Sequence, residues 1–517
     1  MPRSLTQGLH HSLRRHPAHV ATICGSRQQN FQQLADRTAR LGGALQSLGV
    51  KPDDRIAILA LNSDRFIECY LGVMWAGAAV SPLNIRGSRA EIGYALSNGR
   101  ASLLMADDQF AAMAQSLKAE GLVNNVIHIG DAPTPNAMLG YESLLAHAEP
   151  IADAGRNGDD LAMLLYTGGT TGTPKGVMLS HANLASASEG MSALGCGTGD
   201  VHLHAVPMFH MAGIQMLFNH LIGGGTHVVQ PAFEPKATLQ IIEQEHVSSM
   251  MLVPTMLQMM IEHPIAKSLK LTSLQRVFYG AAPISEALLR RAMALLPKTE
   301  FIQGYGMTET GITLMLPARY HTKEGQSLGK LRAAGMATPE AEVRIVDGED
   351  RDVPRGTAGE IVVRGPMVMR GYWQQPELTA SIIRDGWLHT GDVGVMDDDG
   401  FVFIVDRLKD MIVSGGENVY SSEVENALAQ HPAVLTCAVI GVPHEKWGEA
   451  VHAVVVRKAD ASVTEEELIA QCRQLIAVYK CPRSIEFREA LPLSAAGKVL
   501  KNELRAAFWT RHSRRVA

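Results

Sequence analysis

The chain lacks the features that would indicate disulfides, a cysteine-based metal site or a nucleic-acid surface. Its six cysteines are scattered over 517 residues without a CxxC pair, which excludes a disulfide framework and fits reduced thiols. His202, His204 and His210 have no cysteine or carboxylate partner at ligand spacing, so we interpret them as ordinary histidines rather than a metal cluster. A net charge of −5 argues against nucleic acid as a partner.

The sequence also lacks a long apolar run and an apolar signal core. No stretch is long enough to span a bilayer, so we expect no transmembrane segment. The N-terminus is rich in arginine and has no acidic residue before Asp36, which weakly resembles a transit peptide; an ordered first helix is the favoured interpretation. We therefore expect a cytoplasmic protein, and its oligomeric state stays open, a homodimer included.

The first four hundred residues alternate between helical and strand patterns. Leucines between Leu34 and Leu48 recur at helical spacing, and Gly49 follows as a C-terminal cap. Residues 56–59 indicate a buried strand, and Ser63 is typical of the N-cap of the next helix. Such alternation predicts wound α/β layers with largely parallel sheets. The same alternation continues in a strand at 226–230, a helix at 236–246 and a strand at 250–253.

The pattern changes after Glu342. Short alternating strands, such as 343–346 and 360–364, are separated by Gly and Pro turns and predict an antiparallel, barrel-like segment. A charged junction at 406–410 then precedes a region with its own strands and a helix that starts at Thr464. The chain is long enough for several cores. We predict an α/β fold with a large N-terminal domain over 1–406 and a small α+β C-terminal domain over 407–517.

The most informative feature is a Gly/Thr-rich run that follows a short apolar strand at 162–166. Its glycines let the backbone approach a bulky anion, while its hydroxyls and a lysine offer donors and one positive charge. A Gly-rich loop after a strand commonly holds a polyphosphate, but this run lacks the Walker A spacing. We therefore predict a nucleotide-phosphate loop of another kind. The run is Thr167-Gly168-Gly169-Thr170-Thr171-Gly172-Thr173-Pro174-Lys175-Gly176.

Further motifs follow this run in order. Together they resemble the adenylate-forming superfamily of acyl-CoA synthetases, peptide-synthetase adenylation domains and beetle luciferases, over essentially the whole chain. The motifs are Gly280-Ala281-Ala282-Pro283, Gly304-Tyr305-Gly306-Met307-Thr308-Glu309, Thr390-Gly391-Asp392, Asp406-Arg407-Leu408-Lys409, Gly415-Gly416-Glu417-Asn418 and, near the end, Gly497-Lys498.

The resemblance implies an ATP and magnesium site. Asp392 is implied on the ribose hydroxyls and Arg407 near the ribose or phosphate, while Thr308 and Glu309 are implied to serve phosphate and magnesium. Magnesium suits this arrangement because it prefers a carboxylate together with substrate phosphates. For Glu309 a capping or salt-bridged role is the alternative, and for Asp392 a role in the turn. The remaining implied ATP residues are Thr167, Gly168, Gly169, Thr170, Thr171, Lys175, Gly280, Ala281, Ala282, Pro283, Gln303, Gly304, Tyr305, stacked on adenine or simply core, and Gly306.

The resemblance makes Lys498 the catalytic lysine. Joining a carboxylate to ATP brings two anions together, so positive charge must lie at the reacting phosphorus. Lys498 near the carboxylate and the α-phosphate would reduce that repulsion. Lys409 is implied as the pivot about which a mobile C-terminal domain rotates after adenylation. At Gly168 the family usually has serine, so Thr167, Thr170 and Thr171 are the expected hydroxyl donors.

The stretch from Lys409 to Tyr420 is closest to that of CoA ligases. The resemblance implies that Gly415 and Gly416 help to form the pantetheine tunnel and that His210 gates the acyl pocket, with a satisfied core histidine as the alternative. Trp447 beside the entering CoA and Lys480 on its phosphates are further expectations. Plain packing for Trp447 and a solvated face for Lys480 are equally good interpretations.

The acid is less well defined. Gly304 and Gly306 leave room where acetate-specific relatives place a tryptophan, which favours an acid larger than acetate. The methionine-rich segment 250–260 suits an adaptable hydrocarbon tunnel, although core packing explains it better. We expect an ATP-, Mg²⁺- and coenzyme A-dependent carboxylate:CoA ligase for a medium- or long-chain fatty acid. The alternatives are an aryl-propenoate ligase, an enzyme that adenylates for a carrier protein or for luciferase-like oxidation, and a catalytically silent binding protein.

Overall fold

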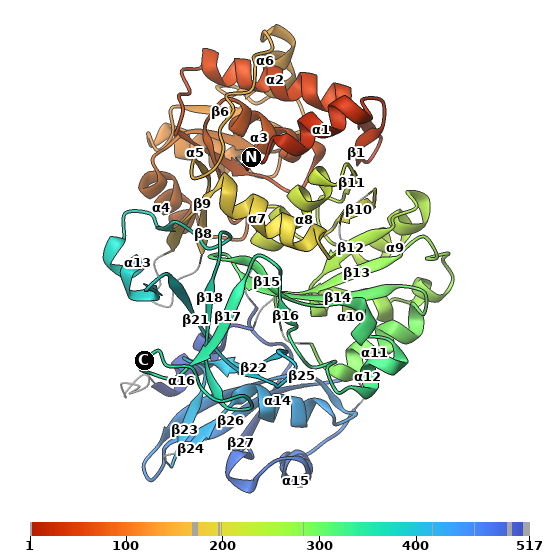
Figure 1. The fold of residues 1–517 in the computed structure, drawn as a ribbon, viewed down its shortest axis with the longest axis vertical. Helices are drawn as coiled ribbons and strands as arrows, with labels where there is room; N and C mark the ends of the chain where they lie inside the picture. The colour runs from red at the N-terminus through yellow and green to blue at the C-terminus, as the bar shows by residue number, and fades with distance from the viewer. Residues whose placement is uncertain are drawn as a thin grey trace.

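In the residues that it describes, the computed structural model contains four sheets, which Figure 1 shows in relation to their helices. None of the helices in the described ranges combines the length and apolar character that a bilayer crossing requires. The structure describes residues 3–167, 174–194, 197, 199–282, 284–415, 417–459, 461–493 and 499–509.

The largest sheet has nine strands. Its strands are β1 (Val20–Cys24), β2 (Arg27–Asn30), β10 (Val201–His204), β11 (Thr226–Val229), β12 (Ser249–Leu252), β13 (Arg276–Gly280), β14 (Glu300–Met307), β15 (Gly311–Leu316) and β16 (Met336–Ala337). They lie in the order β16-β15-β14-β13-β12-β10-β11-β1-β2. The strands from β1 to β14 pair in parallel, whereas β2, β15 and β16 are antiparallel to their neighbours.

The second sheet has eight strands in the order β19-β9-β8-β4-β3-β5-β6-β7. Their bounds are β3 (Arg55–Leu59), β4 (Ala79–Pro82), β5 (Ala101–Ala106), β6 (Asn125–His128), β7 (Leu139–Gly140), β8 (Leu161–Thr167), β9 (Lys175–Ser180) and β19 (Gly371–Tyr372). Strand β19 comes from much later in the chain and pairs antiparallel with β9. It therefore brings Tyr372 beside the strand that follows the Gly/Thr-rich run.

Helices lie between and outside these two sheets. Their bounds are α1 (Gln7–Arg15), α2 (Phe31–Ser47), α3 (Asp64–Trp75), α4 (Arg89–Gly99), α5 (Ala111–Ala119), α6 (Tyr141–His147), α7 (His181–Ser192), α8 (Met211–Ile222), α9 (Pro235–Gln244), α10 (Pro254–Glu262), α11 (Glu286–Leu295), α12 (Lys323–Ser327) and α13 (Pro376–Ile382), with short 3₁₀ turns at Pro264–Lys267 and Ala318–Tyr320. Helices α7 and α8 share apolar cores with both sheets, and Figure 1 shows them in yellow at the centre. Helices α9 to α11 pack on the outer face of the first sheet and α4 and α5 on that of the second.

Local sequence signals account for several of these elements. Helix α2 covers the predicted leucine pattern, and Gly49 after it has φ +85°, a conformation that favours glycine. The hydroxyl of Ser63 accepts a hydrogen bond from the Phe66 N–H at 3.1 Å, so the predicted N-cap is confirmed. The ordered first helix is confirmed as α1. The predicted α/β alternation is likewise confirmed. Helices pack on both faces of the two largely parallel sheets, as buried parallel strands require.

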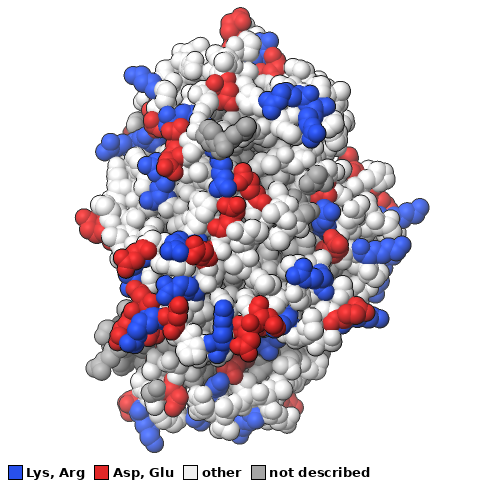
Figure 2. All heavy atoms as spheres, in the orientation of Figure 1, with Lys and Arg blue, Asp and Glu red and all other residues white. Residues whose placement is uncertain are grey.

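The third sheet is the predicted antiparallel segment. It contains β17 (Glu342–Val346), β18 (Ala358–Arg364), β20 (Ile383–Arg384), β21 (Trp387–Met396) and β22 (Val402–Arg407). Every strand pairing in it is antiparallel, and β21 pairs with β22 along the edge that leads to the charged junction. Ion pairs such as Arg364–Glu342 cross its surface, and Figure 2 shows positive and negative side chains interspersed over the face in view.

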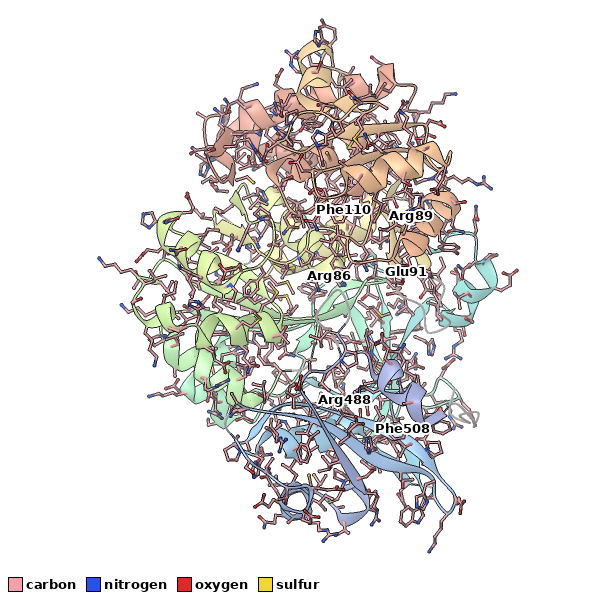
Figure 3. The ribbon with its side chains drawn as sticks, turned by 180° about the vertical axis from the view of Figure 1, so that it is seen from behind. Arg86, Arg89, Glu91, Phe110, Arg488 and Phe508 are labelled. Carbon is pink, nitrogen blue, oxygen red and sulfur yellow. The ribbon has the colours of Figure 1, made fainter. Side chains whose placement is uncertain are left out.

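The fourth sheet belongs to the last part of the chain. Its elements are β23 (Ile412–Ser414), β24 (Glu417–Val419), α14 (Ser421–Ala429), β25 (Val434–His444), β26 (Gly448–Arg457), α15 (Glu465–Leu475), a 3₁₀ turn at Val478–Lys480, β27 (Ser484–Arg488) and α16 (Lys501–Trp509). Helices α14 and α15 pack on one face of this sheet and α16 on the other. Figure 3 shows Phe508 of α16 against this sheet, far from Arg86 and Arg89 near the start of α4. The fold is thus the predicted large α/β part followed by a small α+β part.

A cluster of buried histidines lies between strands β10 and β11 of the largest sheet and helix α8. His204 Nε2 is 2.9 Å from His227 Nδ1, and the rings of His202 and His220 stack with centroids 3.9 Å apart. The Ser249 hydroxyl lies between the second pair, 2.9 Å from His202 Nδ1 and 3.2 Å from His220 Nε2. Burial lowers the pKa of His202 and His204, and it lowers the pKa of His227 to about 3. These three imidazoles are therefore neutral in the folded protein at neutral pH.

This cluster predicts a loss of stability in mild acid. An unfolded histidine takes up a proton near pH 6.5, whereas folded His227 does so only near its pKa of about 3. The unfolded state thus binds more protons in this window, and stability falls as the pH drops below 6.5, by about 1.4 kcal/mol per pH unit for each such histidine. Thermal unfolding midpoints measured between pH 7.5 and 5.5 should fall steeply. His227→Gln should flatten that dependence, while the same substitution at exposed His16 should leave it unchanged; equal slopes in both variants would contradict the prediction.

Candidate active site

Strands β13 and β14 bring two predicted adenine-side motifs together. Gly280 at the end of β13 is the Cα partner of Gly304 on β14. A Cβ on Gly280 would lie 2.1 Å from the Gly304 carbonyl oxygen, so only glycine permits this approach. Ala281 follows with φ +63°, which turns the chain away from the sheet before Ala282. Gln303 accepts a hydrogen bond from the Tyr279 hydroxyl at 3.2 Å.

Tyr305, Asp392 and Arg407 form one connected group. The Tyr305 hydroxyl donates to Asp392 Oδ2 at 2.7 Å, and Arg407 Nε lies 3.1 Å from Asp392 Oδ1. Asp392 and Arg407 are Cα partners on β21 and β22. Burial and the neighbouring Asp392 carboxylate raise the pKa of Tyr305, and Asp392 also raises the pKa of Arg407. The buried carboxylate is therefore paired from two sides by residues from two different sheets.

Glu309 lies in the tight turn between β14 and β15, after Thr308. Where the two strands meet this turn, a Cβ on Gly306 of β14 would lie 1.8 Å from the carbonyl oxygen of Gly311 at the start of β15. The Glu309 side chain is buried, and its Oε1 accepts a hydrogen bond from the Tyr372 hydroxyl at 2.8 Å. Burial raises the pKa of Glu309 more than the Tyr372 hydrogen bond and the charges of Lys175 and Arg407 lower it. The electrostatic effect of these two cations links Glu309 to the Asp392 group and to the Gly/Thr-rich run.

The two ends of that run meet across a strand pair. Thr167 ends β8 and Lys175 begins β9, and the two are Cα partners. Lys175 Nζ lies 5.3 Å from the centre of the Tyr372 ring, within the range of a cation–π contact. Seven predicted site residues lie outside the described residues: Gly168, Gly169, Thr170, Thr171, Pro283, Gly416 and Lys498.

The predicted hinge is a hydrogen-bonded turn. The Arg407 carbonyl accepts from the backbone N–H groups of Asp410 and Met411 at 2.9 and 3.0 Å. Burial, followed by the charge of Arg407, lowers the pKa of Lys409. On the side of the turn that precedes Arg407, the buried Asp406 carboxylate accepts hydrogen bonds from the N–H and the hydroxyl of Ser421 at the start of α14.

Helix α16 contacts both α14 and the same turn, which the sequence patterns did not indicate. Lys501 Nζ lies 2.6 Å from the Ser421 hydroxyl and 2.7 Å from the Glu425 carboxylate. Arg505 pairs with Asp410 at 2.5 Å. Helix α16 begins at Lys501, shortly after Lys498 in the sequence. The helix that contacts the predicted hinge therefore follows the predicted catalytic lysine. No local motif reveals this pairing, since the partners are far apart in sequence.

Trp447 and Gly415 adjoin one another in the small sheet region. Gly415 has φ +63°, and its N–H donates to the Trp447 carbonyl at 2.9 Å. The Trp447 ring stacks on His444 with centroids 4.2 Å apart, and the Arg483 guanidinium lies 4.6 Å from its centre. Trp447 is thus part of an aromatic and cationic stack beside the Gly415 loop.

Lys480 and His210 lie elsewhere in the fold. Lys480 pairs with Glu423 of α14, with Nζ 2.8 Å from both carboxylate oxygens. His210 is the residue before α8, and its carbonyl accepts from the Ile214 N–H at 3.0 Å. The roles expected for these two residues stay predictions.

Comparisons with known proteins agree with this geometry. The sequence profile described as "AMP-binding enzyme" matches residues 9–373, and the profile described as "AMP-binding enzyme C-terminal domain" matches residues 423–498. The chain belongs to the AMP-binding enzyme family. This family is the adenylate-forming superfamily that the motifs resemble, so that expectation is confirmed.

Similar proteins align with nearly the whole length of this AMP-binding enzyme. A feruloyl-CoA synthase from Amycolatopsis sp is 38% identical over 497 residues, covering 95% of this chain and 96% of its own. The fatty acid–[acyl-carrier-protein] ligase ScoC from Streptomyces coeruleorubidus is 35% identical, covering 97% and 95%. The crystal structure of ATP-bound MatB from Rhodopseudomonas palustris superimposes with a TM-score of 0.89 at 32% identity, covering 98% and 99%. The protein is an AMP-forming ligase of the acid–thiol class, and its family implies the use of ATP and CoA.

Tyr305→Phe should destabilise the fold of this AMP-binding enzyme. The substitution keeps the ring but removes one hydrogen bond to the buried Asp392 carboxylate, and a hydrogen bond to a charged group contributes about 1.5–3 kcal/mol. Chemical denaturation should report a loss of about that size. Tyr320→Phe is the matched control because the Tyr320 hydroxyl makes only a long contact of 3.4 Å with Arg319. Equal losses in the two variants would contradict this account of the Tyr305–Asp392 pair.

Proposed function

We propose that the protein is an ATP- and Mg²⁺-dependent carboxylate:CoA ligase that works in two half-reactions. In the first, a carboxylate oxygen attacks the α-phosphorus of ATP and pyrophosphate leaves. In the second, the CoA thiol attacks the carbonyl carbon of the acyl-adenylate and AMP leaves. The observation that carries the proposal is the connected group of Tyr305, Asp392 and Arg407 beside buried Glu309 and Lys175.

Each member of this group suits a part of ATP. The Asp392 carboxylate can accept hydrogen bonds from ribose hydroxyls, and Arg407 is a cation held next to it. The Tyr305 ring, flanked by glycines, suits stacking on adenine. Lys175, at the end of the Gly/Thr-rich run, suits contact with the leaving pyrophosphate. The assignments of Gly280, Ala281, Ala282, Gln303, Gly304, Gly306 and Thr167 to the nucleotide pocket belong to the same proposal.

Glu309 and Thr308 are the proposed magnesium residues. Magnesium is commonly held by one or two carboxylates with the rest of its ligands from phosphates and water. The buried Glu309 carboxylate lies in the field of two cations, Lys175 and Arg407, that suit a polyphosphate, and this arrangement fits the pattern. Magnesium would supply positive charge to the triphosphate, while the chain's own residues position the carboxylate and the nucleotide.

We further propose that the chain divides at 406/407 and that the part after it rotates between the half-reactions. The hydrogen-bonded turn at Arg407 supports a hinge there. In this scheme Lys498 neutralises the two anions during adenylation, and Gly415, Gly416 and Trp447 then face the acyl-adenylate. His210 gates the acyl pocket. Lys480 is a weaker CoA candidate, because its ammonium is already paired with Glu423.

The acid is proposed to be apolar and larger than acetate. Next to Gly304, the side chain of Ile312 belongs to a buried apolar cluster between α8 and the sheet. The predicted methionine segment is divided: Met251 joins this cluster, whereas Met250 and Met260 pack in the outer core. The cluster comprises Met191, Val206, Met216, Met251, Phe278, Ile302, Ile312 and Met315.

Two classes of acid fit an acyl pocket lined by this apolar cluster. An aryl-propenoate is favoured by the similarity to the feruloyl-CoA synthase, the most identical of the relatives compared above. A medium- or long-chain fatty acid is the second candidate, because flexible methionines can adapt to an alkyl chain. AMP release measured with ATP, Mg²⁺ and CoA over matched aryl and fatty acids separates them. Pyrophosphate exchange without CoA-dependent AMP release would instead point to a carrier-protein acceptor and overturn the CoA assignment.

Lys498→Ala should separate the half-reactions. The substitution removes the positive charge of Lys498 from beside the reacting phosphate, so adenylation should slow by about 100-fold or more. CoA attack on supplied acyl-AMP should stay close to the unsubstituted rate. Single-turnover assays of each half-reaction measure this difference. Equal impairment of both would rule out a lysine that acts only in adenylation.

Lys409→Pro should have the reverse effect. Proline restricts the backbone at the proposed pivot, so adenylation should persist while conversion of acyl-AMP to acyl-CoA slows. Lys409→Ala is the control that removes the side chain without restricting the backbone. Normal overall turnover in the proline variant would argue against a pivot at this residue.

A further inference from the structure

Tyr372 is the residue through which three segments of the site are joined. It was not part of any motif that the sequence indicated. Its hydroxyl donates to Glu309 Oε1 at 2.8 Å, and its ring lies 5.3 Å from Lys175 Nζ. One side chain therefore contacts both the proposed magnesium carboxylate and the lysine of the Gly/Thr-rich run.

The backbone around Tyr372 is held firmly. Strand β19 pairs with β9, and the next residue, Trp373, donates its N–H to the Gly176 carbonyl at 2.7 Å. The Tyr372 N–H donates to the Thr379 hydroxyl at 2.9 Å. The Met369 N–H donates to the Glu309 carbonyl at 2.8 Å, which ties the backbone of this segment to the Glu309 turn as well. The hydroxyl is thus presented from a fixed position to a fixed carboxylate.

The Tyr372 hydroxyl contacts one of the two oxygens of the Glu309 carboxylate. The Tyr372 hydrogen bond engages Oε1, and a cation that bound both oxygens would have to compete with it. Oε2 can bind a cation without displacing this hydrogen bond. Magnesium demands near-octahedral geometry with short bonds, whereas calcium accepts bidentate carboxylates and higher coordination numbers. A carboxylate restricted to one oxygen therefore favours the smaller ion.

We propose that Tyr372 is a positioning residue that makes Glu309 a one-oxygen ligand and so selects Mg²⁺ over Ca²⁺ in the ATP complex. The inference rests on the proposed function, since it takes Glu309 as the magnesium carboxylate. Hydrogen-bond partners of metal ligands typically change metal affinity by about 10–100-fold when removed. Tyr372→Phe keeps the ring over Lys175 and removes only the hydroxyl.

The chain contains a matched control. Tyr141 donates its hydroxyl to the buried Glu68 at 2.5 Å, in the same kind of tyrosine–carboxylate pair. Glu68 is also paired with Arg37 in the region of α2, α3 and α6, outside the proposed site. Tyr141→Phe therefore reports the structural cost of losing such a hydroxyl without touching Glu309.

The experiment measures binding rather than turnover. Without an acid substrate, ATP binding is followed by calorimetry and by thermal unfolding midpoints with Mg²⁺, with Ca²⁺ and with EDTA, for the unsubstituted protein, Tyr372→Phe, Tyr141→Phe and Glu309→Gln. We expect Tyr372→Phe to weaken MgATP binding by about tenfold while CaATP binding changes little. Tyr141→Phe should lower the midpoint in all conditions but leave the Mg²⁺ to Ca²⁺ preference unchanged.

The outcomes separate this inference from the function on which it rests. If Glu309→Gln abolishes the metal dependence of ATP binding but Tyr372→Phe keeps the original preference, the role of Tyr372 is overturned and the magnesium site stands. If Glu309→Gln binds MgATP like the unsubstituted protein, the magnesium assignment fails and the inference fails with it. A loss of preference in Tyr141→Phe as well would overturn a local effect of Tyr372.

Discussion

The ion pair between Asp392 and Arg407 is the interaction on which the rest of the site depends. It crosses from β21 to β22, where the two residues are Cα partners. Arg407 is also the residue whose carbonyl closes the turn at the proposed hinge. This ion pair thus connects the proposed nucleotide side of the site to the start of the small C-terminal part. Tyr305 reaches the same carboxylate from the largest sheet, so three structural units meet at one buried charge.

Burying such charges is costly, and the structure offsets the cost with hydrogen bonds and opposite charges. Asp392 has partners on both oxygens. Glu309 has Tyr372 as a hydrogen-bond donor and lies in the field of two cations. At the hinge, Asp410 would have its pKa raised by burial, but Lys501 and Arg505 outweigh that effect and lower it. Each of these buried carboxylates is therefore paired by groups from distant parts of the chain.

The small C-terminal part also contributes contacts to the turn at residues 407–411 and to α14. Its helix α16 packs on the fourth sheet, contacts α14 through Lys501, and contacts the turn at the proposed hinge through Arg505. A rotation about the proposed hinge would therefore move α16 together with the rest of the small C-terminal part. This arrangement explains physically how a change in a few backbone angles can be transmitted to a residue far along the chain.

The amino-acid sequence by itself predicted the alternation of helices and strands in the first four hundred residues, the change to antiparallel strands after Glu342 and the family. These depend on local periodicity, caps such as Ser63 and short motifs, and each is written in neighbouring residues. Only the tertiary structure decided that Tyr372 meets Glu309 and Lys175, and that α16 contacts the proposed hinge. Those contacts arise from strand pairing and helix packing between residues that are distant in sequence, where no local pattern records the partner.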